Sequence, residues 1–307
     1  MTTCLVLGGK GFIGSHIVNA LFTEGYNVKV FDKSMDKKFP EKVECIYGDF
    51  FNFKEWESAL KDVDFIFHNI CTTIPKSSNE DIIYDIETNV IGNVRFLQEV
   101  VKSETEKFIF SSSGGTIYGE PHVLPIPESH PTNPISSYGI SKLAFEKYLN
   151  FFNNEYGLDF ISLRYSNVFG EGQNPKGMVG AVIIFLELLR ERKPITIYGN
   201  GNSVRDYIYI DDVIKANLLT ACKKSKHKIF NVGTSIGTSV ETLIETIFRI
   251  THKQTEVFFT GKRSGDVSTN ILDISLIKRE FDWDPKVNLE DGILKIWTYM
   301  QNDINPI

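Results

Sequence analysis

The sequence contains little cysteine and no apolar run long enough to cross a membrane. Four of its 307 residues are cysteines, and they form neither a Cys-x-x-Cys pair nor the spacing of a metal site: Cys4, Cys45, Cys71 and Cys222. This pattern predicts reduced thiols, a cytoplasmic location and no bound metal. The longest apolar stretch, from Met178 to Leu189, is too short for a transmembrane helix. No basic leader with an apolar segment is recognisable, so we expect neither secretion nor a membrane partner.

An excess of positive charge is also missing. Lys and Arg number 33 against 39 Asp and Glu, which gives a net charge of -6. This balance disfavours a nucleic-acid partner, because phosphate contacts need a basic face. It leaves room for a small anionic ligand, since a few cations and helix N-termini suffice to bind one. A content of 42% hydrophobic and 23% charged residues is that of a globular protein, and the length favours two lobes.

Short apolar segments alternate with helical patterns through the first half of the chain. The strand-like segments are 5–7, 28–31, 64–67, 108–110 and 160–163, and the helix-like segments are 14–23, 53–60, 87–102 and 137–156. Gly157 is placed to end the last of these helices. The alternation predicts βαβ units and a parallel sheet, that is, an α/β protein with a doubly wound Rossmann domain over residues 1–170.

The pattern changes after residue 170. A loop rich in Gly, Asn and Pro at 170–177 leads into a more mixed region, with a strand-like segment at 195–198. We therefore predict a smaller mixed lobe over residues 171–307. Another strand-like segment at 229–232 indicates that the chain returns to the first domain around 204–238.

A glycine-rich turn joins the first expected strand to the first expected helix. It comprises Gly8, Gly11, Phe12, Ile13 and Gly14. Glycines at this place allow positive φ, close approach of backbone N–H groups to a pyrophosphate, and tight helix–strand packing. Asp32 ends the second expected strand, where a carboxylate binds the ribose diol of an adenosine and would repel a 2′-phosphate. The pattern predicts NAD as the cofactor, and the turn lacks the Gly-Lys-Ser/Thr of an NTPase loop.

A tyrosine and a lysine are spaced four residues apart in the helix-like segment 137–156. Tyr138 and Lys142 therefore share one face of the expected helix. An ammonium near a phenol favours the phenolate, so we expect Lys142 to lower the pKa of Tyr138 toward the working pH of a general base. Such a pair is common on solvated helices, and the nucleotide-binding turn is what favours a catalytic interpretation.

In these motifs the chain resembles the extended short-chain dehydrogenase/reductases, in particular the nucleotide-sugar epimerase/dehydratase group. The resemblance spans nearly the whole chain and rests on Gly8-x-x-Gly11-x-x-Gly14, Asp32, Gly48-Asp49-Phe50, His68-Asn69, Asn89, Ser111-Ser112-Ser113 with Tyr118-Gly119, Tyr138-x-x-x-Lys142, Arg164-Tyr165-Ser166-Asn167, Arg205-Asp206-Tyr207 and Arg263-x-Gly265-Asp266. Within the group, the chain is most similar to UDP-sugar C4-epimerases of the UDP-glucose 4-epimerase kind, found in carbohydrate-polymer pathways. The resemblance implies an isomerase with tightly bound NAD that acts on a UDP-hexose.

The resemblance also implies a role for individual residues at the cofactor. Asp49 and Phe50 would flank the adenine, and Asn89 would belong to the cofactor site. Tyr138 would be the catalytic base, and Lys142 its electrostatic partner and a ligand of the nicotinamide ribose.

A second set of implied roles concerns the substrate. Asn167, Arg205 and Arg263 would hold the diphosphate and ribose of UDP, and Asp266 would bind the uridine ribose. A planar guanidinium suits this task because it donates two hydrogen bonds at once. Asn270 would stand where bulky 2-substituents are admitted or excluded. Its intermediate size leaves glucose/galactose, N-acetylhexosamine and uronate substrates open.

One motif departs from the family pattern. These enzymes usually carry Ser or Thr four residues before the tyrosine of their Tyr-Gly pair, where it hydrogen-bonds the sugar 4-hydroxyl, but here Gly114 precedes Tyr118 by four. We expect Ser113 to take this role if the loop bulges by one residue, with Thr116 as the other candidate. The same stretch lacks the Asp-Glu pair of 4,6-dehydratases, which argues against that reaction.

Two other functions stay open on the same fold. A nucleotide-sugar 4,6-dehydratase or 4-ketoreductase is the first alternative, and a non-enzymatic NAD-binding scaffold is a distant one, because this fold hosts many functions. By family analogy we expect a homodimer, formed through the outer faces of the helices at 87–102 and 137–156 as a four-helix bundle.

Overall fold

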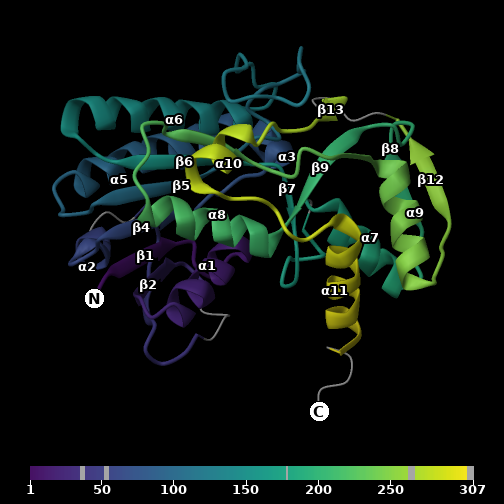
Figure 1. Cartoon of the computed structure of the whole chain (residues 1–307), viewed down its shortest axis with the longest axis horizontal. Coiled ribbons are helices and arrows are strands. Elements are labelled where there is room, and N and C mark those ends of the chain that lie inside the picture. The colour runs from purple at the N-terminus through teal and green to yellow at the C-terminus, as the bar shows by residue number, and fades with distance from the viewer. Residues whose placement is uncertain (35–38, 52–54, 178, 262–266, 303–307) are drawn as a thin grey trace. The chain divides into compact units, whose positions relative to one another are not determined.

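The computed structural model describes residues 1–34, 39–51, 55–177, 179–261 and 267–302. The chain divides into two compact units (Figure 1). Unit 1 comprises Met1–Ile117, Thr132–Arg164 and Ile214–Phe230, and unit 2 comprises Tyr118–Pro131, Tyr165–Val213 and Asn231–Ile307. The predicted division lies at residue 170, with a return to the first domain around 204–238. In the structure the returning segment is 214–230, and residues 118–131 belong to the second unit.

Unit 1 is built on a seven-stranded sheet, which confirms the predicted Rossmann-type α/β fold. The strand order is β10-β6-β5-β4-β1-β2-β3. The strands are β1 (Thr3–Leu7), β2 (Asn27–Asp32), β3 (Glu44–Tyr47), β4 (Phe65–His68), β5 (Lys107–Ser113), β6 (Phe160–Tyr165) and β10 (Ile229–Val232). The four pairs from β3 through β1 to β5 are parallel. Because the chain builds outward in opposite directions from β1, the sheet has its switch point between β1 and β4, where such folds bind ligands.

Helices cover both faces of this sheet, with α5 and α6 on one side and α1 and α8 on the other (Figure 1). They are α1 (Phe12–Thr23), α2 (Trp56–Leu60), α3 (Pro75–Glu80), α4 (Ile82–Ile86), a π-helical turn η2 (Glu87–Ile91), α5 (Gly92–Val100), α6 (Ser137–Tyr156) and α8 (Ile210–Cys222). The bounds of α6 match the prediction. The Ser136 side chain accepts a hydrogen bond from the N–H of Gly139, and Gly157 ends the helix with φ 73°.

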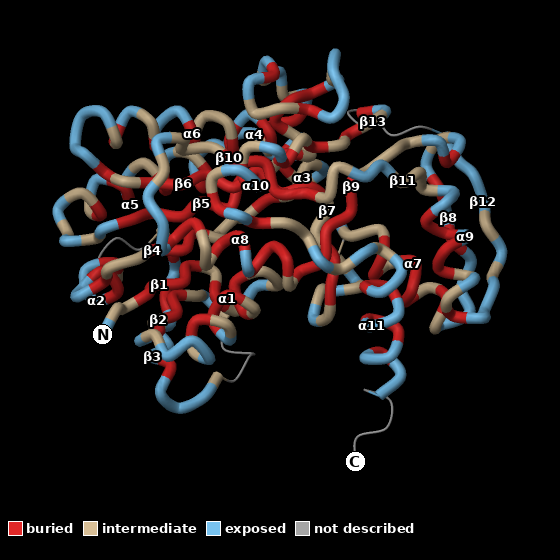
Figure 2. The backbone as a smooth tube through the Cα atoms, in the orientation of Figure 1, coloured by how far each residue is buried: buried red, intermediate tan, exposed pale blue. Residues whose placement is uncertain are grey.

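The core of unit 1 is unusually aromatic. Strands β1, β4 and β5 are buried along most of their length (Figure 2). Between the sheet and the helices lies one cluster that includes Phe31, Phe50, Trp56, Phe96, Phe108, Phe110 and Phe145. Burying a phenylalanine contributes about 1.5–3 kcal/mol, so this cluster holds β4 and β5 firmly where they end in the candidate site.

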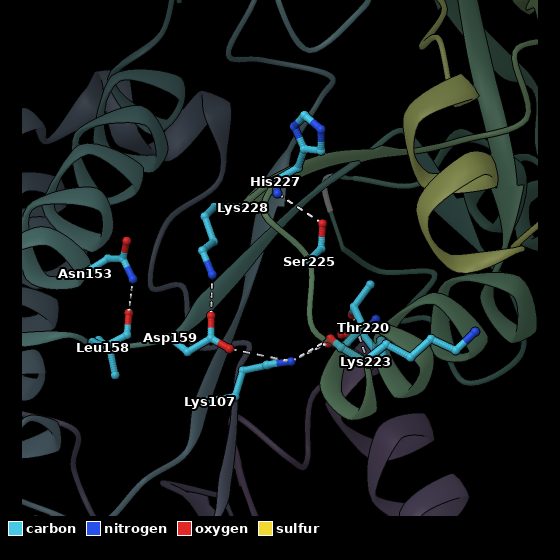
Figure 3. Close-up of polar contacts among 10 residues, drawn as sticks. Lys107, Asn153, Leu158, Asp159, Thr220, Lys223, Ser225, His227 and Lys228 are labelled. Atoms are coloured by element: carbon cyan, nitrogen blue, oxygen red, sulfur yellow. Dashed lines mark hydrogen bonds and ion pairs between the residues drawn. The ribbon is translucent and has the colours of Figure 1, made fainter.

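The amino ends of β5 and β6 are joined by a polar network (Figure 3). Lys107 is buried at the start of β5, and its ammonium donates to the Thr220 carbonyl at 3.3 Å and to the Lys223 carbonyl at 2.7 Å. Asp159 pairs with Lys107 at 3.7 Å and with Lys228 at 2.5 Å. The Lys107 ammonium thus binds the C-terminal end of α8 to the sheet. The role of these charged residues is structural.

Unit 2 is smaller and mixed, as predicted. Its elements are β7 (Asn167–Phe169), α7 (Ala181–Arg190), β8 (Ile195–Tyr198), β9 (Val204–Tyr209), β11 (Gly237–Ser239), α9 (Val240–Thr251), β12 (Val257–Thr260), β13 (Thr269–Asn270), α10 (Ser275–Phe281) and α11 (Leu289–Asn302). Strand β9 pairs with β11 in antiparallel fashion and with β7 and β13 in parallel fashion, and β8 pairs with β12 in parallel. In the described part of the chain, no helix has the length and apolar character needed to cross a membrane.

Candidate active site

The turn between β1 and α1 requires its glycines for definite reasons. Gly8 has φ 69°, and its N–H donates to the Phe31 carbonyl at 2.9 Å. A Cβ on Gly14 would stand 2.2 Å from the Gly8 carbonyl oxygen, so only glycine permits the helix to pack this close to the turn. Gly11 precedes α1 and has no side chain with which to cap it, which leaves first-turn N–H groups available to an anion.

A cavity of about 390 Å³ opens beside this turn. It is lined by Gly8, Lys10, Gly11, Phe31, Asp32, Lys33, Ser34, Gly48, Asp49, Phe50, Phe51, Asn69, Ile70, Cys71, Thr72 and Tyr84. The Asp32 carboxylate accepts hydrogen bonds from the N–H of Lys10 at 2.9 Å and of Ser34 at 3.0 Å. These bonds fix the carboxylate at the cavity wall with acceptor sites left for a diol. A glycine turn, a fixed carboxylate and a cavity of this kind fit the adenosine diphosphate part of NAD.

The other predicted cofactor residues lie in two places. Asp49 and Phe50 both line the cavity, although the Phe50 ring is 4% exposed and packs mainly in the aromatic core. Phe12 and Ile13 belong to the first turn of α1, and neither they nor Gly14 is among the described residues that line this cavity.

Tyr138 and Lys142 occupy successive turns of α6; Lys142 is buried and Tyr138 is half-buried. The Lys142 ammonium donates to the Ser111 carbonyl at 2.8 Å and lies 5.7 Å from the centroid of the Tyr138 ring. It also lies 4.7 Å from the Phe110 ring centroid. The backbone N–H of Tyr138 donates to the Ser78 hydroxyl at 3.0 Å. The end of β5 and helix α3 therefore both hold this pair in place.

The protonation of Tyr138 differs from the expectation. Burial raises the pKa of the phenol well above its ordinary value, Cys71 and Asp85 raise it further, and a hydrogen bond with Ser113 lowers it. The net shift of the Tyr138 pKa is therefore opposite to the predicted one. Burial has the largest effect on this pKa, and the Lys142 ammonium is bound to the Ser111 carbonyl.

The structure distinguishes the two candidate hydroxyls. Ser113 lowers the pKa of Tyr138, and Thr116 donates to the Ser113 oxygen at 2.9 Å. Ser113 is thus the hydroxyl that acts on Tyr138, and Thr116 stands behind it.

Asn89 lies in the π-helical turn, and its amide is engaged with the protein. The Asn89 nitrogen donates to the hydroxyls of Thr72 and Thr73 and to the Asp85 carboxylate, each at 3.0 Å, while its oxygen accepts from the Thr72 N–H at 3.1 Å. Asn89 therefore shapes the loop after β4 that lines the cavity. Among these partners, sequence reasoning missed Asp85, although its spacing four residues before Asn89 on a helix would have indicated a contact.

Unit 2 carries the predicted substrate residues. The Asn167 amide donates to the Asp206 carbonyl at 3.2 Å. The Arg205 guanidinium donates to the carbonyls of Val204 at 2.9 Å and Val267 at 2.9 Å, so it anchors the segment that begins at 267. Asn270 pairs with Arg205 in the β13–β9 register and is 1% exposed. Arg263 and Asp266 lie outside the described residues.

Metal chemistry finds no support in what the structure describes. Over residues 1–34, 39–51, 55–177, 179–261 and 267–302, no group of three His, Cys, Asp or Glu side chains could hold a metal ion.

A glycine turn after the first strand, an acid at the end of the second and a Tyr-x-x-x-Lys pair on α6 define a dinucleotide-binding protein of the short-chain dehydrogenase/reductase type.

Comparison with known proteins gives the family. The model of the NAD-dependent epimerase/dehydratase family matches residues 4–233. The chain therefore belongs to the NAD-dependent epimerase/dehydratase family.

Individual relatives cover almost the whole chain. A putative UDP-glucose 4-epimerase of Methanocaldococcus jannaschii is 38% identical over 97% of this chain and 98% of its own length. A dTDP-4-dehydro-6-deoxyglucose reductase of Escherichia coli is 36% identical over 95% of each chain. The crystal structure of the Thermotoga maritima UDP-glucose 4-epimerase with UDP-glucose is similar with a TM-score of 0.95 and 39% identity, covering 99% of this chain and 100% of that one.

Proposed function

We propose that this chain is an NAD-dependent epimerase that inverts C4 of a UDP-hexose through a transient 4-keto intermediate. The observation that carries the proposal is the Tyr138 phenol with the Lys142 ammonium 5.7 Å from its ring centroid, in the same unit as the dinucleotide cavity. Full-length similarity to UDP-glucose 4-epimerases supports the sugar nucleotide as the substrate class.

Each residue of this group has a task that its surroundings suit. When bound, NAD⁺ would supply a reversible acceptor for the C4 hydride and the positive charge of its oxidised ring. Tyr138 takes the proton of the sugar 4-hydroxyl and gives it back after the sugar has turned over. Ser113 donates to the phenolate oxygen, and Thr116 donates to Ser113, so the negative charge is stabilised by a chain of hydroxyls. Lys142 contributes its charge from the next turn of α6.

The cofactor assignments follow from the cavity. We assign Asp32 to the adenosine ribose diol, the N–H groups of the glycine turn to the pyrophosphate, and Asp49 to the adenine end. Asn89 acts through the loop that it holds.

The substrate assignments rest on the family pattern. From unit 2 we assign Asn167 and Arg205, with Arg263 and Asp266, to the UDP moiety, and Asn270 to the discrimination of 2-substituents. The carbonyl contacts of Arg205 support a shared role for Arg205 and the segment that carries Arg263.

The test is equilibration at C4. Purified protein without added cofactor is incubated with UDP-glucose, UDP-galactose, their N-acetyl analogues and UDP-glucuronate, and NMR follows the C4 configuration. We expect interconversion of one or more pairs without added NAD. A reductase, suggested by the Escherichia coli relative, would instead consume added NAD(P)H in proportion to product.

Tyr138→Phe tests the assigned base. The variant retains the ring packing and removes the hydroxyl assigned to take the proton, so we expect the epimerisation rate to fall at least about 1,000-fold, within the range of a lost proton-transfer group. UDP binding, measured by calorimetry, should stay within about twofold. Loss of UDP binding together with the rate would contradict the role given to Tyr138.

The exposed apolar residues of two helical segments support a homodimer. Ile91 is the last residue of the π-helical turn before α5, and Ile140, Tyr148, Phe151 and Tyr156 lie on α6; all five are exposed. We propose that a second copy of the chain covers these residues. Sedimentation equilibrium tests this, and Phe151→Glu should shift the dimer toward the monomer.

The four free cysteines support a cytoplasmic location.

A further inference from the structure

A carboxylate is enclosed directly behind the catalytic helix. Asp85 of α4 is fully buried, and four side chains donate to it. One oxygen accepts from the Ser137 hydroxyl at 2.8 Å and the Ser141 hydroxyl at 2.6 Å. The other accepts from the Asn89 amide at 3.0 Å and from the Thr73 hydroxyl.

These donors come from the two segments that hold the reacting groups. Ser137 precedes Tyr138 and Ser141 precedes Lys142, so one carboxylate oxygen clamps the first turn of α6 at the same four-residue spacing as the catalytic pair. Thr73 belongs to the loop after β4, whose residues Cys71 and Thr72 line the dinucleotide cavity.

The chemistry of the four donors explains why an acid stands here. An ionised carboxylate only accepts hydrogen bonds, whereas an asparagine amide would present its own N–H groups to some of these donors. Burying a carboxylate is costly unless its bonds are satisfied, and the partners here are neutral hydroxyls and an amide. The N-terminal turn of α6 adds a favourable partial positive charge.

We propose that Asp85 is a positioning residue that fixes Tyr138 and Lys142 against the cofactor loop and sets a negative charge beside the base. The inference rests on the proposed function, because it assigns Tyr138 as the base. The inference goes beyond the proposed function because it concerns Asp85, a residue that touches neither the sugar nor the cofactor.

The charge has a consequence that packing alone does not have. Among the residues that the structure describes, Cys71 from the loop after β4 and Asp85 from α4 act on the phenol, and the Lys142 ammonium of α6 itself lies 5.7 Å from its ring centroid. Asp85 raises the pKa of Tyr138, after burial and Cys71. Replacing the charge by a neutral amide should therefore lower that pKa.

Asp85→Asn in the NAD-loaded enzyme is the first test. We expect kcat for C4 epimerisation to fall about 10- to 100-fold, the order expected when a reacting group is misplaced. KM for the UDP-sugar should stay within about twofold, and the acid limb of the kcat profile should move to lower pH. An unchanged kcat and an unchanged acid limb would overturn the proposal.

A second readout needs no turnover. Tyrosines labelled with ¹³C at Cζ are titrated by NMR, with Tyr138→Phe used to assign the resonance. The Tyr138 signal should begin to ionise at lower pH in Asp85→Asn than in the wild type, and coincident titrations would contradict the charge assignment. If the wild type fails to equilibrate any UDP-hexose, the proposed function fails while this titration still tests Asp85.

Two further variants separate position from charge. Ser137→Ala combined with Ser141→Ala keeps the charge and releases the clamp, so kcat should fall at least about tenfold while the acid limb stays in place. The double serine variant also replaces Asp85→Asn as the test if that variant does not fold.

The matched control is Asp212→Asn, which removes another buried carboxylate. The Asp212 carboxylate accepts hydrogen bonds from the N–H groups of Lys286 and Val287 at 2.9 Å. It should lower thermal stability without moving the acid limb; an equal shift in the control would refute a specific role for Asp85.

Discussion

His68 provides a prediction whose magnitude follows from the structure. It ends β4, is 1% exposed, and is surrounded by Phe50, Phe96, Phe108, Phe110 and Phe145 at ring-centroid distances of 5.5–6.3 Å. Burial, reinforced by the charge of Lys142, lowers the pKa of His68 from 6.5 to about 3. The imidazole is therefore neutral in the folded protein at physiological pH.

Its hydrogen bond fixes the neutral tautomer. The Asn93 amide nitrogen donates to the Asn89 carbonyl at 2.8 Å, so the Asn93 oxygen faces His68 and accepts from Nε2 at 3.0 Å. His68 thus joins the aromatic core to the π-helical turn that carries Asn89.

The sign of the pH dependence follows from linkage. Below pH 6.5 the unfolded chain binds a proton at His68 and the folded chain does not, so stability is complete above that pH and is lost as the pH falls toward 3. Well below pH 6.5, the free energy of unfolding falls by about 1.4 kcal/mol for each pH unit. Between pH 8 and pH 5 the loss amounts to roughly 2 kcal/mol, because the unfolded-state imidazole is then almost fully protonated.

His68→Gln isolates this term. Glutamine retains a donor for Asn93 and does not titrate, so carboxylates and other groups cancel in the difference between the two proteins. Urea unfolding at several pH values should show the wild type more stable at pH 8 and this advantage reduced by about 2 kcal/mol at pH 5.

The control is a histidine at the surface. His252 is exposed in a left-handed backbone conformation that asparagine tolerates, so His252→Asn should run parallel to the wild type at every pH. A stability difference between wild type and His68→Gln that stays constant within about 0.5 kcal/mol from pH 8 to pH 5 would refute the reasoning.

Two other substitutions follow from equally definite contacts. Gly14→Ala forces a Cβ to 2.2 Å from the Gly8 carbonyl oxygen, so the purified variant should retain less than about a tenth of the wild-type NAD, as chromatography of the extracted cofactor would show; full retention would contradict the packing argument. Glu146→Gln removes the carboxylate that lies 2.6 Å from the guanidinium of Arg164, whose side chain is 3% exposed. We expect a loss of about 3–5 kcal/mol in unfolding free energy by urea denaturation, and a loss below about 1 kcal/mol would disprove the assigned weight of this ion pair.

Much of unit 1 was predictable because its signals are local. The glycine turn, the apolar strands and the Tyr-x-x-x-Lys spacing each need only neighbouring residues, and Gly157 ends α6 as its backbone freedom indicates. The return of the chain to the sheet was predicted from one apolar segment, and in the structure β10 lies beside β6.

What was missed depends on contacts between distant segments. Strand β3 (Glu44–Tyr47) is largely exposed at the sheet edge and has no apolar alternation, so it gave no signal. The short helices α3 and α4 lack a periodic apolar face of sufficient length. The raised pKa of Tyr138 needed the burial of the phenol, which the spacing to Lys142 does not reveal.

The candidate site shows the same division. Asp32 and Tyr138 follow from motif position, whereas the hydroxyl next to Tyr138 could not be chosen between Ser113 and Thr116 without the loop geometry. The spacing of Asp85 to Asn89 indicates one contact, but the full set of partners could not be predicted because the four donors come from three segments of the chain.

The central claim is that C4 is oxidised and reduced again within one site. UDP-glucose deuterated at C4 is incubated with the purified enzyme in ordinary water, and NMR and mass spectrometry follow the product. We expect UDP-galactose that carries the deuterium at C4, with no cofactor consumed. Product that has lost the deuterium to solvent would contradict hydride return, and complete absence of C4 inversion in every UDP-hexose would contradict the epimerase itself.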